Sequence, residues 1–220
     1  MKNDMWNVEN IQKYAKNKTR EILHDIILPF KDIDYNIYLN VGNKSNPLNL
    51  LSPNSGIISS TAIGTIIESF IRINLNQSYN FPLNSNKTAE DFSISDDNII
   101  IGCNIKTERF DKYNTNKGIS AINPLITFYN NANKQNKKAL LLIIKIRYQI
   151  LNIPDYHIHI SEFDAYYLEN FITYQPKCDK RNWSSAEFKK ESGRLQTTSV
   201  KYDRFPTNEE VLKTLKQFKK

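Results

Sequence analysis

One aliphatic run constrains the fold of this chain more than any other feature of its sequence. Residues 139–146 read ALLLIIKI, and only Lys145 interrupts the run. A strand without alternation needs cover on both faces of its sheet. The run is also too short for a membrane-spanning helix, which needs ~20 apolar residues. We therefore predict a central strand over 139–150, within a sheet that has helices on both sides.

Periodic patterns before and after this run predict the other elements. Apolar residues spaced by three and four indicate helices, and strict alternation indicates half-buried strands. After Pro206, Thr207 and Glu210 have the spacing of a capping box, which marks the start of a helix. The other expected helices cover 8–27, 63–71 and 119–132, and the other expected strands cover 33–41, 98–106, 156–161 and 193–202. This order predicts an α/β fold with a central mixed β-sheet flanked by helices.

The chain is basic. Its 220 residues include 30 Lys and Arg against 23 Asp and Glu, a formal net charge of +7. The length suits one domain, which we expect to span 1–220. A basic excess favours a polyanionic partner such as nucleic acid, because each phosphate contact releases bound counterions. A solvated lysine-rich surface is the alternative explanation of the charge.

Three features indicate a cytoplasmic location. The first ten residues lack the apolar stretch of a signal peptide. No apolar run reaches the length of a membrane span. Cys103 and Cys178 match no metal-binding or redox spacing, as expected in a reducing compartment. We therefore expect a cytoplasmic protein without a membrane partner.

Residues 88–110 carry the strongest chemical signal. A strand alternates its side chains, so Asn104 and Lys106 share one face while Ile105 points to the other. Asp91 precedes a turn, and the returning strand brings Asn104 and Lys106 back beside it. Carboxylate, amide and carbonyl oxygens suit a hard cation such as Mg²⁺, and a neighbouring lysine suits phosphodiester hydrolysis. Short patterns of this kind also occur by chance in many strands.

This segment resembles the signature of the PD-(D/E)XK nucleases, in which an aspartate precedes a strand that ends in an acid, any residue and a lysine. The chain is most similar to type II restriction endonucleases, particularly the EcoRV and HincII branch and HpaI. The similarity runs roughly from Gly64 to Phe205. It rests on GTIIESF (64–70), EDF (90–92), GCNIKTERF (102–110), INPLITFY (122–129) and GRLQTTS (193–199).

The resemblance implies roles for individual residues. Asp91 would bind the metal, Ile105 would offer its backbone carbonyl, and Lys106 would occupy the position of the catalytic lysine. Glu68, on the preceding helix, would be an auxiliary acid; a solvated helix residue is the alternative. The catalytic core would cover about 57–165.

Asn104 departs from the family pattern, which has Asp or Glu at this position. An amide oxygen can ligate a cation but brings no charge, so Asn104 should lower metal affinity and rate. Three explanations remain open: a natural variant that works with Asn, a weakened relative, and a substitution introduced to hold DNA uncut. On the third explanation, which we favour slightly, Asn104→Asp should raise cleavage by orders of magnitude.

Three polar loops, over 107–118, 130–138 and 177–196, are the expected DNA contacts. They fall in two regions, about 107–138 and 175–200. Arg and Lys suit the edge of guanine, and Asn and Gln suit that of adenine. A solvated loop is the alternative for any one of these residues. The candidates are Arg109, Asn116, Lys180, Arg181, Asn182 and Gln196.

Two further patterns are expected to be structural. His157 and His159 lie two apart on a strand, a spacing that can bind zinc, but no spaced partner nearby in the sequence completes a site. Cys103 points away from Asn104 and is expected to be a small core residue.

The sequence therefore predicts a sequence-specific double-stranded DNA endonuclease. The resemblance implies Mg²⁺ as cofactor, with Mn²⁺ able to substitute, and a homodimer that cuts both strands of a short palindromic site. Three alternatives stay open: a structure-selective repair or junction nuclease on the same scaffold, a DNA-binding module without catalysis, and a structural or protein-interaction domain.

Overall fold

A computed structural model describes most of the predicted core. The described residues are 8–28, 34–35, 64, 67–69, 71, 73, 88–110, 118–151, 157–171, 186–188, 194–197 and 205–217. Within them, no helix is long and apolar enough to span a lipid bilayer.

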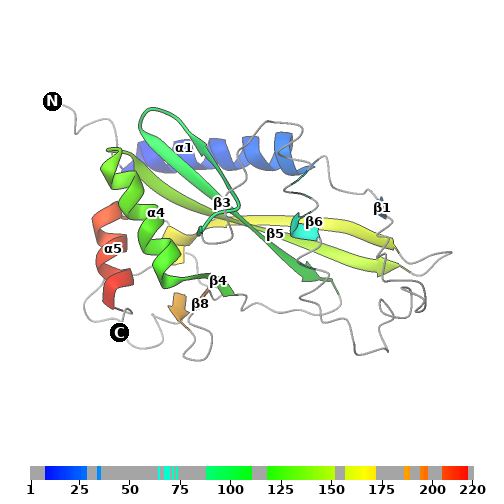
Figure 1. Cartoon of the computed structure of the whole chain (residues 1–220). Coiled ribbons are helices and arrows are strands. Elements are labelled where there is room, and N and C mark those ends of the chain that lie inside the picture. Colours follow the sequence, from blue (N-terminus) through cyan, green and yellow to red (C-terminus); the bar gives the residue numbers. More distant parts are fainter. Residues whose placement is uncertain are drawn as a thin grey trace.

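A five-stranded mixed sheet forms the centre of the fold (Figure 1). Its strand order is β1-β6-β5-β3-β2, so β5 is the middle strand, as the aliphatic run predicts. β3 and β5 run parallel, and the other neighbours are antiparallel. The strands are β1 (Asp34–Tyr35), β2 (Phe92–Ser95), β3 (Ile99–Arg109), β5 (Lys138–Leu151) and β6 (His157–Tyr167). The sheet confirms the predicted α/β class.

One face of the sheet is apolar, and N-terminal helices cover it. They are α1 (Val8–Glu21) and the π-helix η1 (Ile22–Ile27), with the helical residues described between 64 and 73. Their buried side chains join those of alternate strand positions, including Cys103 and Ile105, in one cluster. Gly64 lies so close to the side chain of Thr107 that a β-carbon would collide with it. We refer to this side as the α1 face.

The opposite face is covered at one end by α4 (Ile122–Lys134) and α5 (Asn208–Gln217), which lie together at that end of the sheet (Figure 1). α4 connects β3 to β5, because parallel neighbours need a crossover connection. Leu125, Phe128 and Val211 pack there with Leu141 and other residues in a second cluster. We refer to this side as the α4 face.

The α5 helix begins as the sequence predicts. The Thr207 backbone N–H donates to Glu210 Oε2 at 2.8 Å, and the Glu210 N–H donates to Thr207 Oγ1 at 3.2 Å. These two bonds satisfy amide groups that the helix itself leaves unpaired. The capping box is confirmed.

Several predicted loops are partly regular structure. β3 continues to Arg109, so the predicted loop over 107–118 begins too early. The predicted loop over 130–138 is mostly helix, because α4 continues to Lys134 and ends in a turn in which Asn136 adopts a positive φ of 53°. Asn tolerates this left-handed conformation, which is common after helices.

A second, three-stranded sheet has the order β4-β8-β7. Its strands are β4 (Gly118–Ala121), β7 (Ala186–Phe188) and β8 (Arg194–Thr197). The third predicted loop, over 177–196, therefore contains one strand and the start of another. Of the predicted strand over 33–41, only β1 lies within the described residues. The assignment of 1–220 to a single domain stays a prediction.

Candidate functional site

The hairpin of β2 and β3 brings Asp91 to the backbone of Ile105. Phe92 lies opposite Cys103 in the antiparallel register, so Asp91, one residue earlier, lies beside Asn104 near the middle of β3. The Asp91 backbone N–H donates to the Cys103 carbonyl at 2.7 Å. The Ile105 N–H donates to Asp91 Oδ2 at 2.7 Å. The aspartate side chain is therefore held against the backbone of Ile105.

Lys106 contacts the backbone of the same residue. Its Nζ donates to the Ile105 carbonyl oxygen at 3.1 Å, and its side chain is half-buried. Asp91 and Lys106 thus contact the amide and the carbonyl of one residue, Ile105. A carboxylate, a backbone carbonyl and an ammonium group lie around one point of β3.

Asn104 is buried on the α4 face, with 6% of its surface exposed. Its Nδ2 donates to the Ala89 carbonyl at 2.7 Å. Its Oδ1 is buried without a hydrogen-bond partner. A buried polar atom without a partner lowers the stability of a protein by about 1–3 kcal/mol. This oxygen is therefore suited to bind a cation.

Glu90, the residue before Asp91, is a second carboxylate at this point of the chain and has no role in the predicted site. Its Oε2 is buried and has no hydrogen-bond partner. Burial and the nearby charge of Asp91 raise the pKa of Glu90 above its ordinary value. An acidic residue next to the predicted metal ligand was the available signal, within the motif EDF.

Charged side chains continue along the α4 face beyond Lys106. Glu108 is buried, and its Oε2 lies 3.5 Å from Nε of Arg147 on β5. The Arg147 guanidinium also donates to Glu162 on β6 at 2.7 Å. Lys145, the β5 partner of Lys106, lies with its Nζ 5.9 Å from the Tyr166 ring centre. This part of the sheet surface is polar across three neighbouring strands.

The other predicted site residues are placed less closely, or not at all. Glu68 is helical and half-buried, but Ile67 and Ile71 of the same segment pack on the α1 face, opposite Asn104. Its role as auxiliary acid stays a prediction. Arg109 is the last residue of β3, and Gln196 lies in β8 opposite Gly118. Asn116, Lys180, Arg181 and Asn182 lie outside the described residues.

The residues present fit a site that binds a hard cation with modest affinity. Asp91, Asn104 and Ile105 offer a carboxylate, an amide oxygen and a carbonyl oxygen, which are donors that Mg²⁺ accepts. The unpartnered Asn104 Oδ1 is consistent with such a ligand. Across the described residues, no group of three or more His, Cys, Asp or Glu side chains could hold a metal ion.

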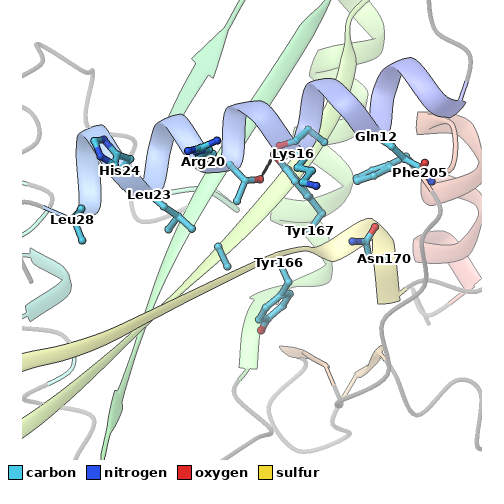
Figure 2. A pocket seen from close by; sticks show the side chains of 13 residues that line it. Gln12, Lys16, Arg20, Leu23, His24, Leu28, Tyr166, Tyr167, Asn170 and Phe205 are labelled. Carbon is cyan, nitrogen blue, oxygen red and sulfur yellow. Dashed lines mark hydrogen bonds between the residues drawn. The ribbon is translucent and has the colours of Figure 1, made fainter.

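A cavity of about 690 Å³ lies elsewhere, between α1 and the end of β6 (Figure 2). Lys16, Arg20 and His24 line it from α1, and Tyr167 and Phe205 line it from the other side. None of the predicted catalytic or metal-binding residues lines it. It is therefore separate from the site around Ile105.

Comparison with known proteins gives a likeness in structure and none in sequence. No family model matches the chain, and no curated protein matches it. Among solved structures, NlaIV restriction endonuclease is similar, with a TM-score of 0.51 and 10% identity over 93% of this chain and 78% of that one. An identity this low supports the fold alone. The chain therefore has a restriction-endonuclease-like fold.

Proposed function

We propose that this protein is a metal-dependent endonuclease that cuts double-stranded DNA. The observation that carries the proposal is the arrangement around Ile105: Asp91 Oδ2 accepts the N–H of this residue, and Lys106 Nζ donates to its carbonyl. This arrangement lies on a restriction-endonuclease-like fold. The net charge of +7 favours a polyanionic substrate.

The residues have distinct roles in the proposed reaction. Asp91, the Asn104 amide oxygen and the Ile105 carbonyl would hold Mg²⁺, for which Mn²⁺ could substitute. When bound, the ion polarises the phosphate and lowers the pKa of a bound water. Lys106 orients the attacking water and balances negative charge that develops on the phosphate. Asn104 contributes an oxygen without charge, so the site binds its ion more weakly than a site with two carboxylates.

The finer predictions are part of the same proposal. We propose type II activity on a short palindromic sequence, with a homodimer presenting one site to each strand. Arg109, Asn116, Lys180, Arg181, Asn182 and Gln196 remain the candidates for DNA contacts. Kinship with the EcoRV, HincII and HpaI branch and a cytoplasmic location also remain predictions.

Digestion of unmethylated plasmid DNA with Mg²⁺ tests the proposal. Asp91→Asn keeps the shape of the side chain and removes its charge, so the cleavage rate should fall at least ~100-fold, since even groups that merely support metal ligands cost 10–100-fold. Asp97→Asn, in the exposed turn between β2 and β3, is the matched control and should cut normally. Discrete fragments would support sequence-specific cutting, and a smear would indicate a nuclease without sequence preference.

Lys106→Ala separates chemistry from metal binding. It should lower the rate ~100-fold, within the usual range for one stabilising or proton-transferring group, and leave metal affinity nearly unchanged. Lys134→Ala, an exposed position near the end of α4, is its control. Absence of cleavage by both the native chain and Asn104→Asp, with either metal, would contradict the proposed function.

A further inference from the structure

The proposed metal site has one carboxylate among its three ligands. A divalent cation bound by Asp91 and two neutral oxygens keeps a net positive charge at the site. Asn104 is also well accommodated as an amide, because its Nδ2 donates to the Ala89 carbonyl at 2.7 Å. An aspartate at this position could not donate that bond. The structure therefore favours a site in which a second negative charge comes from another residue.

Glu90 lies on the same side of β3 as Asn104. A β-carbon added at Gly102 would lie 3.1 Å from Glu90 Cβ and 2.9 Å from ring atoms of Phe128 on α4. Gly102 and Asn104 are two residues apart on one strand, so they share the α4 face. The Glu90 side chain therefore lies over the position next to Asn104, and Gly102 leaves the space for it.

Two unsatisfied oxygens occur in this small region. Glu90 Oε2 and Asn104 Oδ1 are both buried and both lack a hydrogen-bond partner. Buried polar atoms are almost always paired, and each exception calls for an explanation such as an absent ion. Asn104 is more than nine-tenths buried, with 6% of its surface exposed. A cation coordinated by both oxygens would give each of them a partner.

We propose that Glu90 supplies the second anionic oxygen to the metal ion held by Asp91, Asn104 and Ile105. Glu90 then provides the charge that Asn104 lacks, and the asparagine is a working component of the site. The inference rests on the proposed function, since it assigns a further ligand to the same site. It predicts that Glu90 determines metal affinity even in the absence of DNA.

Calorimetric titration of the full chain with Mn²⁺, without DNA, tests the inference. Glu90→Gln preserves the size of the side chain and should weaken Mn²⁺ binding at least ~10-fold, the lower end of the loss seen when even a supporting group of a metal site is removed. Glu209→Gln, an exposed glutamate in the first turn of α5, is the matched control and should bind as the native chain does. Circular dichroism establishes that each variant is folded.

A charge-relocation experiment distinguishes a ligand from a structural residue. Asn104→Asp restores a carboxylate to the site, so adding it to Glu90→Gln should recover most of the lost Mn²⁺ affinity. In the Asn104→Asp background, Glu90→Gln should cost less affinity than in the native chain. Equal losses in the two backgrounds would overturn the inference.

The failure of the inference can be told apart from the failure of the proposed function. If Asp91→Asn abolishes Mn²⁺ binding and Glu90→Gln leaves it unchanged, the metal site stands and Glu90 is not part of it. If neither the native chain nor Asn104→Asp binds Mn²⁺, both proposals are wrong.

Discussion

The two faces of the central sheet differ in what they bury. On the α1 face, the cluster that contains Cys103, Ile105 and Ile144 is apolar. On the α4 face, an apolar cluster covers one end, while Asn104, Lys106 and Glu108 follow along β3 with partners on β5 and β6. The same strand therefore contributes apolar core residues through one set of alternate positions, and the candidate site residues Asn104 and Lys106 through the other.

The difference between the two faces shows where buried polar atoms lower the stability of the fold. Burial of apolar side chains stabilises a protein by about 25 cal/mol per Å², whereas a buried polar atom without a partner destabilises it. Glu90 Oε2 and Asn104 Oδ1 are two such atoms. Glu90 precedes Asp91 in the chain, and Asn104 precedes Ile105, whose N–H donates to Asp91. Positions at which a sequence breaks the rules of burial are expected at functional sites.

The largest expected effect on stability belongs to the α1 face. Ile144 is fully buried in its cluster, so Ile144→Ala should lower the free energy of unfolding by about 2–5 kcal/mol. Mn²⁺ affinity of the folded protein should change little, since Ile144 points away from the site. Urea denaturation and Mn²⁺ titration measure the two quantities. A large loss of Mn²⁺ affinity in the folded variant would contradict the separation of the apolar α1 face from the candidate metal site.

Glu169, on the α4 face, should make the free energy of unfolding depend on pH. Its carboxylate accepts hydrogen bonds from Tyr129 Oη at 2.6 Å and from the Leu141 N–H at 3.0 Å. Burial raises its pKa from 4.5 to about 7, although these bonds and the charge of Lys138 oppose the rise. The folded state therefore holds the proton more tightly than the unfolded state, and stability is lost as pH rises between these values.

The expected loss is about 3 kcal/mol between pH 4.5 and 7, at 1.36 kcal/mol per pKa unit. Glu169→Gln cannot titrate and should have a flatter profile over this range. Urea denaturation of both proteins at intervals of half a pH unit measures the difference. Parallel profiles would show that Glu169 titrates alike in the folded and unfolded states.

Filling the space over Gly102 should have a smaller effect on stability. The added methyl of Gly102→Ala would meet Glu90 and Phe128 at the distances given above, so the free energy of unfolding should fall by about 1–3 kcal/mol. Mn²⁺ affinity should fall as well, because the methyl displaces Glu90. Denaturation and titration of one preparation give both values. Unchanged Mn²⁺ affinity with reduced stability would separate Glu90 from the metal site.

Local sequence rules predicted much of the fold. The aliphatic run identified β5 as the central strand, and the spacing of Thr207 and Glu210 identified the start of α5. The positions of Asp91 and Lys106 around Ile105 also followed from the alternation of a strand and the return of a hairpin. These features depend on residues that are close in the sequence.

Features that depend on distant contacts could not be predicted. The link of Glu108 to Arg147 requires the parallel pairing of β3 and β5, which no local pattern reveals. The sequence shows Glu90 next to Asp91, but the position of Glu90 over Gly102 and its buried oxygen without a partner depend on tertiary packing. The extension of β3 to Arg109 was missed because polar residues at its end resemble a loop, although their neighbours on β5 complete the strand pairing.

The bond between Asp91 and the Ile105 amide closes a loop of only 14 positions. The parallel pairing of β3 with β5 instead joins Ile99 to Lys138, across the whole of α4. The entropic cost of closing a loop grows with its length, and contacts between distant residues slow folding. We therefore expect the β2–β3 hairpin, which carries the candidate metal ligands, to form early in folding. The pairing of β3 with β5 should form later.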